Sequence, residues 1–305
     1  MSTSTFRSAV VRTPGGPESI EIIDVPVAEP GPGEVQVRIA AAAVNPVDLG
    51  VAAGLFHAMG LISQPDHTGL GWDFAGTVIA TGPGVNLAAG TRVAGLVDGF
   101  DRDFGTYAEQ IIVPAENLAV VPDELDLATA STVPVNGLAA AQILDLLGDA
   151  PAGGNRLLVT GAAGAVGGYV VSLARDRGWR VTGLARAEDE DFVRSLGAEF
   201  TTRAEPGWDA VADGAAMQEQ ALALVRDGGA FVGVQPSAKP AAQRGIKVGV
   251  VVAHPDAPRL AGLFARAASG ELPARVHAVV PLDQVATAHR AMAKGGLRGR
   301  YVLEP

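Results

Sequence analysis

The 305-residue chain carries a formal net charge of −10 and is 48% hydrophobic and 18% charged, which is typical of a globular protein long enough for two hydrophobic cores. This acidic balance, with no cluster of Lys and Arg, argues against a nucleic-acid-binding surface, because phosphates attract concentrated positive charge. The chain contains no cysteine, which excludes disulfides and any Cys-ligated zinc site.

Targeting signals and metal-ligand spacings are also missing. No basic N-terminal region precedes an apolar core, and no run of about 18 apolar residues occurs, so we expect a cytoplasmic protein without a membrane span. The five histidines form no pair at the spacing of metal ligands, and we expect no metal site; they are His57, His67, His254, His277 and His289.

The first part of the chain, residues 6–122, has the pattern of an all-β domain. Short apolar runs are separated by Pro and Gly turns, and residues 34–39 alternate apolar and polar side chains as a half-buried strand does. A helix is predicted over residues 51–59, followed by a polar loop. Together these features favour a barrel-like domain.

From Asp123 the pattern changes to alternating strands and helices. Such alternation predicts a parallel, doubly wound sheet with ligands at the carboxyl ends of its strands. Strands are predicted over residues 156–160, 180–185, 199–201, 208–212, 229–234 and 246–252, and helices over 126–132, 138–147, 165–177, 188–196 and 215–226. Helices over 258–268 and 282–293 and strands over 276–280 and 300–303 follow.

This pattern predicts a discontinuous first domain. We expect residues 1–122 and 270–305 to form one domain and residues 123–269 to form the nucleotide-binding domain. The long apolar strand over residues 246–252 is a candidate edge strand, which must be covered, and pairing with a second copy would cover it. We therefore expect a homodimer.

A glycine-rich turn between the strand over residues 156–160 and the following helix is the main functional motif. Residues 162–167 match the dinucleotide fingerprint G-x-G-x-x-G except that Ala162 replaces the first glycine. Such a turn lets the backbone approach a pyrophosphate at the start of the helix. The predicted cofactor-binding residues of this turn are Gly161, Ala162, Ala163, Gly164, Ala165, Val166 and Gly167.

The end of the next strand indicates which dinucleotide binds. An acid there would hydrogen-bond the ribose 2′-hydroxyl of NAD, whereas this chain has Ala185 followed by Arg186. A guanidinium pairs with a 2′-phosphate, so NADPH (NADP) is favoured, although a solvated surface arginine is the alternative.

Nine segments in order along the chain resemble the zinc-independent quinone oxidoreductase branch of the medium-chain dehydrogenase/reductase superfamily. They are residues 31–38, 44–48, 71–78, 89–93, 105–109, 161–167, 196–198, 244–246 and 296–300. The resemblance implies an α/β protein with a GroES-like β-barrel catalytic domain and a Rossmann doubly wound parallel-sheet domain. It also implies hydride transfer from NADPH to a quinone or an α,β-unsaturated carbonyl compound.

Three positions depart from related families. Zinc-dependent relatives carry a Cys near Asn45 and a His directly after Gly71, where this chain has Trp72. Quinone reductases of the family often carry a Tyr two residues after Asp48, where this chain has Gly50. The expected reductase is therefore zinc-independent, and its acceptor need not be a quinone.

Four residues are candidate hydrogen-bond donors or proton sources for the substrate carbonyl: Asn45, Tyr107, His57 and His67. The amide of Asn45 could serve the cofactor ribose or the substrate, or fix the turn before Pro46. Tyr107 also fits a half-buried packing role, and the two histidines also fit solvated loop positions. Asp48 is predicted to cap a helix. Trp72 and Asp73 are predicted either to border the substrate or to form a structural turn.

Further cofactor contacts are expected at Gly233 and Val234, where a strand ends at the ligand-binding edge of the sheet. Arg298 and Arg300 are candidate phosphate contacts by resemblance only, with surface roles as the alternative. A nucleotide-binding regulatory or scaffold protein with lapsed catalysis and a metal-free alcohol dehydrogenase are the alternative functions. The second is disfavoured because no evident Lys and Tyr pair would activate a hydroxyl.

Overall fold

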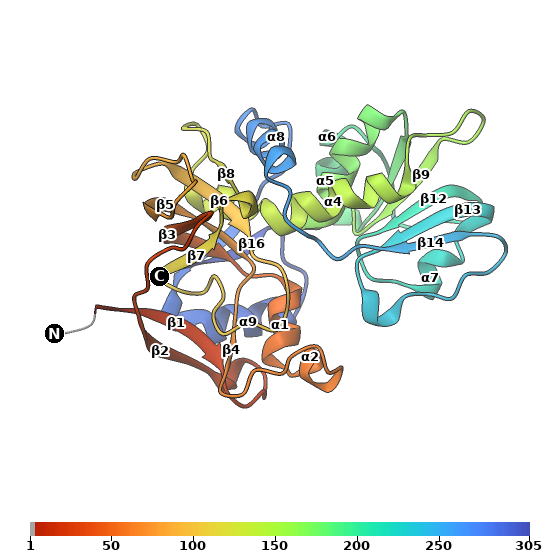
Figure 1. The fold of residues 1–305 in the computed structure, drawn as a ribbon. Coiled ribbons are helices and arrows are strands. Elements are labelled where there is room, and N and C mark those ends of the chain that lie inside the picture. The colour runs from red at the N-terminus through yellow and green to blue at the C-terminus, as the bar shows by residue number, and fades with distance from the viewer. Residues whose placement is uncertain (1–3) are drawn as a thin grey trace. The chain divides into compact units, whose positions relative to one another are not determined.

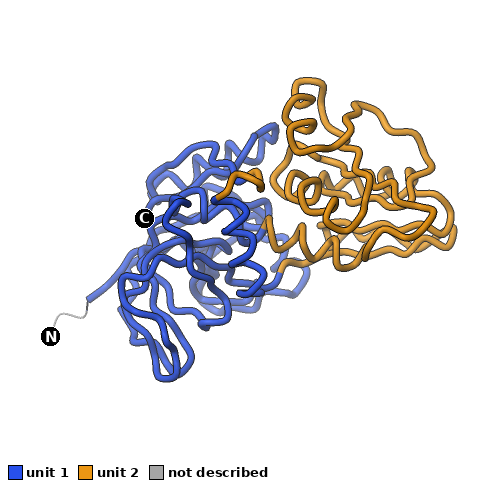
Figure 2. Tube along the Cα trace, turned by 90° about the horizontal axis from the view of Figure 1, so that it is seen from above, with its two compact units in different colours: residues 1–135, 254–268, 274–305 blue, residues 136–253, 269–273 orange. Residues whose placement is uncertain are grey.

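The computed structural model describes residues 4–305, which form two compact units coloured separately in Figure 2. Unit 1 comprises residues up to Val135 together with His254–Ala268 and Ala274–Pro305, and unit 2 comprises Asn136–Ala253 and Ser269–Pro273. The predicted assignment of residues 1–122 and 270–305 to one domain stays a prediction.

Unit 1 is built on two sheets of mainly antiparallel strands. The order β2-β1-β4 forms one sheet, and β15-β16-β3-β5-β6-β8, with β7 also paired to β3, forms the other. Only β15 and β16 pair in parallel among the described strands of unit 1. The strands are β1 (Thr5–Val11), β2 (Ile20–Pro26), β3 (Glu34–Ala43), β4 (Thr68–Gly69), β5 (Asp73–Thr81), β6 (Arg92–Leu96), β7 (Gln110–Pro114), β8 (Leu118–Val120), β15 (Val276–Pro281) and β16 (Arg300–Glu304).

The helices of unit 1 are short. They are α1 (Pro46–Ala52), α2 (Leu55–Ala58), α3 (Leu127–Ser131), α8 (Ala257–Ala268) and α9 (Val285–Ala293), with 3₁₀ turns η1 (Pro17–Ser19), η2 (Ala115–Asn117) and η6 (Leu282–Gln284). The single helix predicted over residues 51–59 is wrong. The chain instead forms α1 and α2, because Gly54 between them has a left-handed φ of 81° that interrupts helical geometry.

Unit 2 contains a six-stranded sheet in the order β11-β10-β9-β12-β13-β14, with every pair parallel. Counted along the chain, this is the 3-2-1-4-5-6 order of the Rossmann fold, so the predicted fold class is confirmed. The strands are β9 (Arg156–Thr160), β10 (Arg180–Leu184), β11 (Glu199–Thr201), β12 (Trp208–Asp213), β13 (Val225–Gly233) and β14 (Lys247–Val250).

Helices cover both faces of this parallel sheet, with α5 and α6 on one side and α7 on the other (Figure 1). The elements are α4 (Pro134–Leu147), α5 (Ala165–Ala174), α6 (Glu190–Ser195), α7 (Glu219–Leu222) and the 3₁₀ turns η3 (Arg175–Arg177), η4 (Ala187–Asp189) and η5 (Pro236–Ala238). The buried core side chains include Leu158, Val211 and Phe231, one from each of three neighbouring strands. Burial on both faces explains why these strands are nearly continuous apolar runs in the sequence.

The helix predicted over residues 215–226 is also wrong. Only Glu219–Leu222 is helical, and β13 begins at Val225. Ala216 and Gln218 have φ values of 54° and 53°, a conformation that interrupts a right-handed helix. The carboxylate of Asp213 stabilises this turn because it accepts hydrogen bonds from the backbone N–H groups of Met217 and Gln218.

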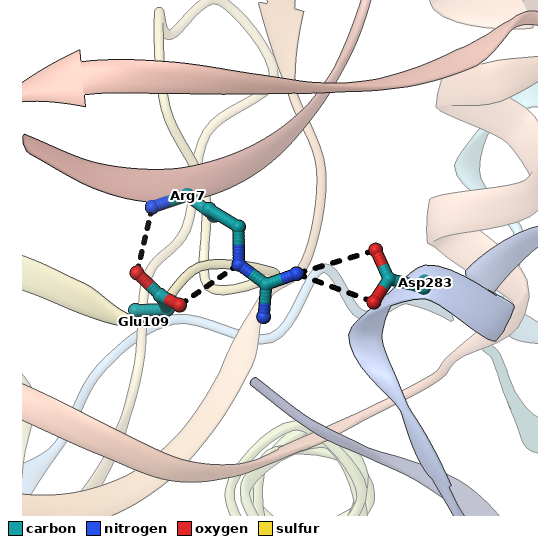
Figure 3. Close-up of polar contacts among 3 residues, drawn as sticks. All are labelled: Arg7, Glu109 and Asp283. Atoms are coloured by element: carbon teal, nitrogen blue, oxygen red, sulfur yellow. Dashed lines mark hydrogen bonds and ion pairs between the residues drawn. The ribbon is translucent and has the colours of Figure 1, made fainter.

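An ion-pair cluster joins three distant segments of unit 1 (Figure 3). The guanidinium of Arg7 on β1 contacts Glu109 Oε1 at 2.9 Å and Asp283 Oδ2 at 3.2 Å, and Glu109 Oε2 also accepts from the Arg7 backbone N–H at 2.8 Å. The hydrogen bonds that the guanidinium donates, first to Glu109 and then to Asp283, raise the pKa of Arg7. The cluster therefore connects the C-terminal part of unit 1 to its first strand.

We expect Arg7→Met to lower the free energy of unfolding by about 1 kcal/mol, because two half-exposed ion pairs are lost and solvent screens both. Urea unfolding at low and high salt measures this change, which should shrink as salt increases. The control is Arg12→Met, since Arg12 contacts only Glu21 in an exposed pair. An equal loss in both variants would contradict a special role for the cluster.

Candidate active site and cofactor site

The glycine-rich turn of unit 2 connects β9 to α5. Gly161 has a φ of 61°, and Gly164 is the N-cap of α5 without any side-chain capping bond. A Cβ atom at Gly167 would overlap the carbonyl oxygen of Gly161, so glycine is required there for close packing of strand and helix. The first N–H groups of α5 lack intrahelical acceptors, as at any helix start, and a phosphate can accept from them.

Ala162, in place of the first glycine of the fingerprint, has a packing explanation. Its side chain is fully buried, and a Cβ atom at Gly183 on the neighbouring strand β10 would lie only 2.7 Å from the Ala162 Cβ. The methyl group thus fills space that Gly183 leaves empty. The role of this turn in binding a pyrophosphate stays a prediction.

Asp213 holds the ligand-binding edge of the sheet together, and the sequence reasoning missed it. Its buried carboxylate accepts from Thr160 Oγ1 at 2.6 Å and from the backbone N–H groups of Met217 and Gln218 at 3.1 and 2.7 Å. It therefore joins the ends of β9 and β12, between which the strand order reverses. An aspartate directly after an apolar strand, followed by glycine, was the signal available in the sequence.

The other predicted cofactor residues of unit 2 lie at strand ends. Arg186 follows β10, is half-exposed, and its Nε lies 3.4 Å from Glu188 Oε1. Gly233 ends β13 and Val234 follows it, and a Cβ atom at Gly233 would lie 3.2 Å from the ring of Phe231. These positions fit contacts with a dinucleotide along the carboxyl edge of the sheet.

In unit 1 the start of α1 is tied to β5. Asn45 is the N-cap of α1 and is 1% exposed, and its Nδ2 donates to Asp73 Oδ2 at 2.8 Å. Its backbone N–H donates to Asp48 Oδ2 at 2.8 Å. The prediction of Asp48 as the helix cap is therefore wrong: Asn45 occupies the cap, and Asp48 is the third helical residue of a capping box.

Tyr107 and the start of α4 complete this network. Tyr107 is fully buried, and its hydroxyl donates to Asp48 Oδ2 at 2.9 Å. Asp73 Oδ1 accepts from the backbone N–H of Val135 at 2.7 Å, in the first turn of α4. The structure thus brings Asn45 and Tyr107 together, but both donors are engaged by carboxyl groups.

Burial dominates the electrostatics of this network. It raises the pKa of Asp48 to about 6 and that of Asp73 to about 8, where the neighbouring charge of Asp48 adds to the effect. It also raises the pKa of Tyr107 well above its usual value and lowers that of Arg102 to about 10. Near pH 7 Asp73 is thus mainly protonated and Asp48 mainly ionised.

The remaining candidates lie outside this network. His57 Nε2 lies 3.2 Å from Thr68 Oγ1, and the His67 ring packs at 5.3 Å from that of Phe104. The positive charge of Arg300 on β16 partly opposes the rise that burial causes in the pKa of Asp73. Arg298 Nη1 donates to the carbonyl oxygen of Gly296 at 2.9 Å. Their predicted roles toward substrate and phosphate stay predictions.

Within residues 4–305, no group of three His, Cys, Asp or Glu side chains is arranged to hold a metal ion. None of the helices described is long and apolar enough to cross a membrane.

Two family models match this chain. The alcohol dehydrogenase GroES-like domain matches residues 31–123, and the zinc-binding dehydrogenase model matches residues 186–303. Together they cover more than half of the chain. The chain belongs to the medium-chain dehydrogenase/reductase superfamily, as the resemblance predicts. Oxidoreductases of this superfamily use nicotinamide cofactors.

Individual relatives are oxidoreductases by name. The chloroplastic quinone-oxidoreductase homolog of Spinacia oleracea is 31% identical over 61% of this chain and 56% of its own length. The 2-haloacrylate reductase of Burkholderia sp. is 31% identical over 64% of this chain and 57% of its own. The chain thus spans little more than half the length of these relatives, and as little as 4% of some others.

The fold is shared with solved structures. The quinone oxidoreductase from Coxiella burnetii superposes with a TM-score of 0.87 at 24% identity, over 99% of this chain and 100% of that one. At this level of identity the likeness defines the fold, a GroES-like part with a Rossmann-like parallel sheet.

The raised pKa of Asp73 predicts how stability depends on pH. Its folded-state pKa of about 8 exceeds the ordinary aspartate value of 3.8, so the folded state binds more protons than the unfolded state between these two values, and stability is lost as the pH rises from one to the other. One proton corresponds to a slope of about 1.4 kcal/mol per pH unit. We expect Asp73→Asn to flatten this slope between about pH 6 and 8, in urea unfolding.

Asp101→Asn is the matched control, because Asp101 is exposed and hydrogen bonds from Ser63 lower its pKa, so it does not titrate in this window. The Asp101 variant should retain the wild-type slope. Equal slopes in the wild type and the Asp73 variant would disprove the assignment.

Proposed function

We propose that this protein is an NADPH-dependent, zinc-independent reductase that transfers a hydride to a quinone or an α,β-unsaturated carbonyl compound. The observation that carries the proposal is the uncapped Gly161–Gly167 turn at the start of α5, on a parallel sheet of Rossmann order. The reductase names of the relatives support the substrate class.

The chemistry that NADPH supplies is a hydride, and the chain has to bind the acceptor, exclude water and stabilise the charge that develops on its carbonyl oxygen. Asn45 and Tyr107 are proposed to act near this site. The Tyr107 hydroxyl donates its one proton to Asp48 and must exchange that partner before it serves a ligand. The Asn45 amide donates one N–H to Asp73, and its second N–H lies near the Ala43 carbonyl oxygen at a donor–acceptor distance of 3.4 Å. His57 and His67 remain candidates for proton supply.

Turnover tests the proposal directly. In the presence of EDTA, the purified protein should oxidise NADPH when 1,4-naphthoquinone or 2-cyclohexen-1-one is added. The loss of NADPH absorbance measures this reaction. NADPH binding without turnover of either acceptor would favour a regulatory or scaffold protein. Reduction of NADP by simple alcohols alone would favour an alcohol dehydrogenase, and stoichiometric zinc in the active protein would defeat the metal-free proposal.

Arg186 is proposed to select NADPH through its 2′-phosphate. We expect Arg186→Ala to weaken NADPH binding about tenfold, because a charge-assisted contact is lost, and to leave NADH binding unchanged. Isothermal titration with both dinucleotides measures this difference. The control is Arg203→Ala, since Arg203 pairs with Glu205 on an exposed surface. Equal affinity of the wild type for NADH and NADPH would contradict the assignment.

A homodimer through β14 is also proposed, since β14 lies at the edge of the parallel sheet and Val252, two residues after its end, is 48% exposed. In antiparallel pairing of two copies, Val252→Glu places like charges near each other, and we expect the dimer to weaken at least tenfold. Light scattering during size-exclusion chromatography measures the mass. A monomeric wild type would disprove the dimer.

A further inference from the structure

The three tryptophans of the chain differ in how their indole N–H groups are satisfied. Trp179 Nε1 donates to the carbonyl oxygen of Gly148 at 3.0 Å, and Trp208 Nε1 donates to that of Glu205 at 2.9 Å. Trp72 is 2% exposed, and its Nε1 has no acceptor among residues 4–305. A buried donor without an acceptor is unfavourable, which makes Trp72 a candidate for binding a ligand.

Other unsatisfied polar atoms lie in the same part of unit 1. Arg102 Nε, Thr106 Oγ1 and both ring nitrogens of His67 are buried without a partner among the described residues. The Arg102 guanidinium carbon lies 5.4 Å from the centre of the Trp72 ring, and the backbone N–H of Thr106 donates to the carbonyl oxygen of Gly71. Polar groups left unpaired together indicate a site that a polar ligand completes.

Aromatic rings line the side of Trp72. The ring of Phe100 lies 5.3 Å from that of Trp72 and stacks on the ring of Phe56 at 4.0 Å between centroids. Gly50 allows this arrangement, because a Cβ atom there would lie 2.8 Å from the Phe56 ring. The result is a donor beside flat apolar surfaces, which suits a planar molecule with one polar atom.

The backbone that carries Trp72 is held by hydrogen bonds. The carbonyl oxygen of Trp72 accepts from the Val97 N–H, and that of Gly71 accepts from Arg102 Nη2. The indole itself packs against the ring of Phe100 and the guanidinium of Arg102. A donor on a fixed backbone with a packed ring needs little reorganisation when charge develops on its acceptor.

We propose that Trp72 Nε1–H donates a hydrogen bond to the carbonyl oxygen of the substrate, a planar conjugated ketone or quinone that packs against Phe56 and Phe100. This inference rests on the proposed reductase function. Trp72 then replaces the Lewis acid of a metal-dependent enzyme by a neutral donor.

The hydride that NADPH would supply forms a C–H bond at the β-carbon of the enone, which leaves NADP as the oxidised product. The electrons of the C=C bond move toward the carbonyl group, and its oxygen becomes that of an enolate. Trp72 keeps its proton and stabilises this oxygen, and a proton from water adds to the α-carbon to complete the two-electron reduction. The side chains that cover the indole must shift to admit the oxygen. Gly54, Gly60 and Gly99, with φ of 81°, 70° and 84°, lie close to Phe56 and Phe100 along the chain.

Trp72→Phe removes the donor and keeps an aromatic ring. We expect kcat with 2-cyclohexen-1-one to fall about 100-fold, at the lower end of the loss seen for other donors to a developing oxyanion, with KM changed less and NADPH affinity unchanged. In this variant no hydrogen bond is lost from the free protein, because the Trp72 indole N–H has no acceptor among residues 4–305. The melting temperature should therefore not fall for that reason. The control Trp179→Phe should lower the melting temperature, since its bond to Gly148 is lost, and leave kcat unchanged.

A second measurement in the wild type does not depend on turnover. In ¹⁵N spectra the three indole N–H signals are assigned by their loss in the single variants, and cyclohexanone with NADP is added as an unreactive carbonyl probe. A downfield shift confined to the Trp72 signal supports the inference. Normal kcat in a folded Trp72→Phe, or an unmoved Trp72 signal in an active enzyme, overturns it. Absence of turnover in the wild type would instead overturn the reductase function, whatever the Trp72 signal does.

Discussion

The buried carboxyl group of Asp73 is the constraint on which the arrangement of unit 1 depends. One oxygen accepts from the Asn45 amide at the start of α1, and the other accepts from the Val135 backbone at the start of α4. Two helix starts are therefore fixed by one residue of β5. Burial makes the charged form unfavourable, so the same residue that organises the site also makes its stability sensitive to pH.

This constraint separates the polar groups of unit 1 into two kinds. Asn45 and Tyr107 are engaged by carboxyl groups and hold the fold. Trp72 and Thr106 are buried with unpaired side-chain polar atoms within the described part of the chain. The Tyr107 hydroxyl must exchange its partner before it contacts a ligand, whereas groups of the second kind gain a partner when a ligand binds.

In unit 2 small side chains determine the shape of the glycine-rich turn. Gly161, Gly167 and Gly183 leave space for backbone and for the Ala162 methyl group, and the Asp213 carboxylate then fixes the adjacent loop. The glycine-rich turn accommodates Ala162 in place of the first glycine of the fingerprint because Gly183 on the neighbouring strand leaves space for its methyl group. The shape of this turn therefore depends on two strands and not on one segment.

The sequence by itself determined the fold class and the glycine-rich turn, because hydrophobic periodicity and Gly spacing act over short distances along the chain. It also indicated the family through segments that keep their order. It failed at two places where a side chain bonds the nearby backbone: Asp213 accepts from Met217 and Gln218 in a turn at residues 215–218, and Asn45, not Asp48, occupies the cap of α1.

Only the tertiary structure decided which polar groups are satisfied. The three tryptophans look alike in the sequence, but Trp179 and Trp208 face backbone carbonyl groups and Trp72 does not. Likewise, nothing in the spacing of Asn45, Asp48, Asp73 and Tyr107 shows that they share one network. Such pairings depend on strands and helices brought together from separate segments, and burial then sets their pKa values.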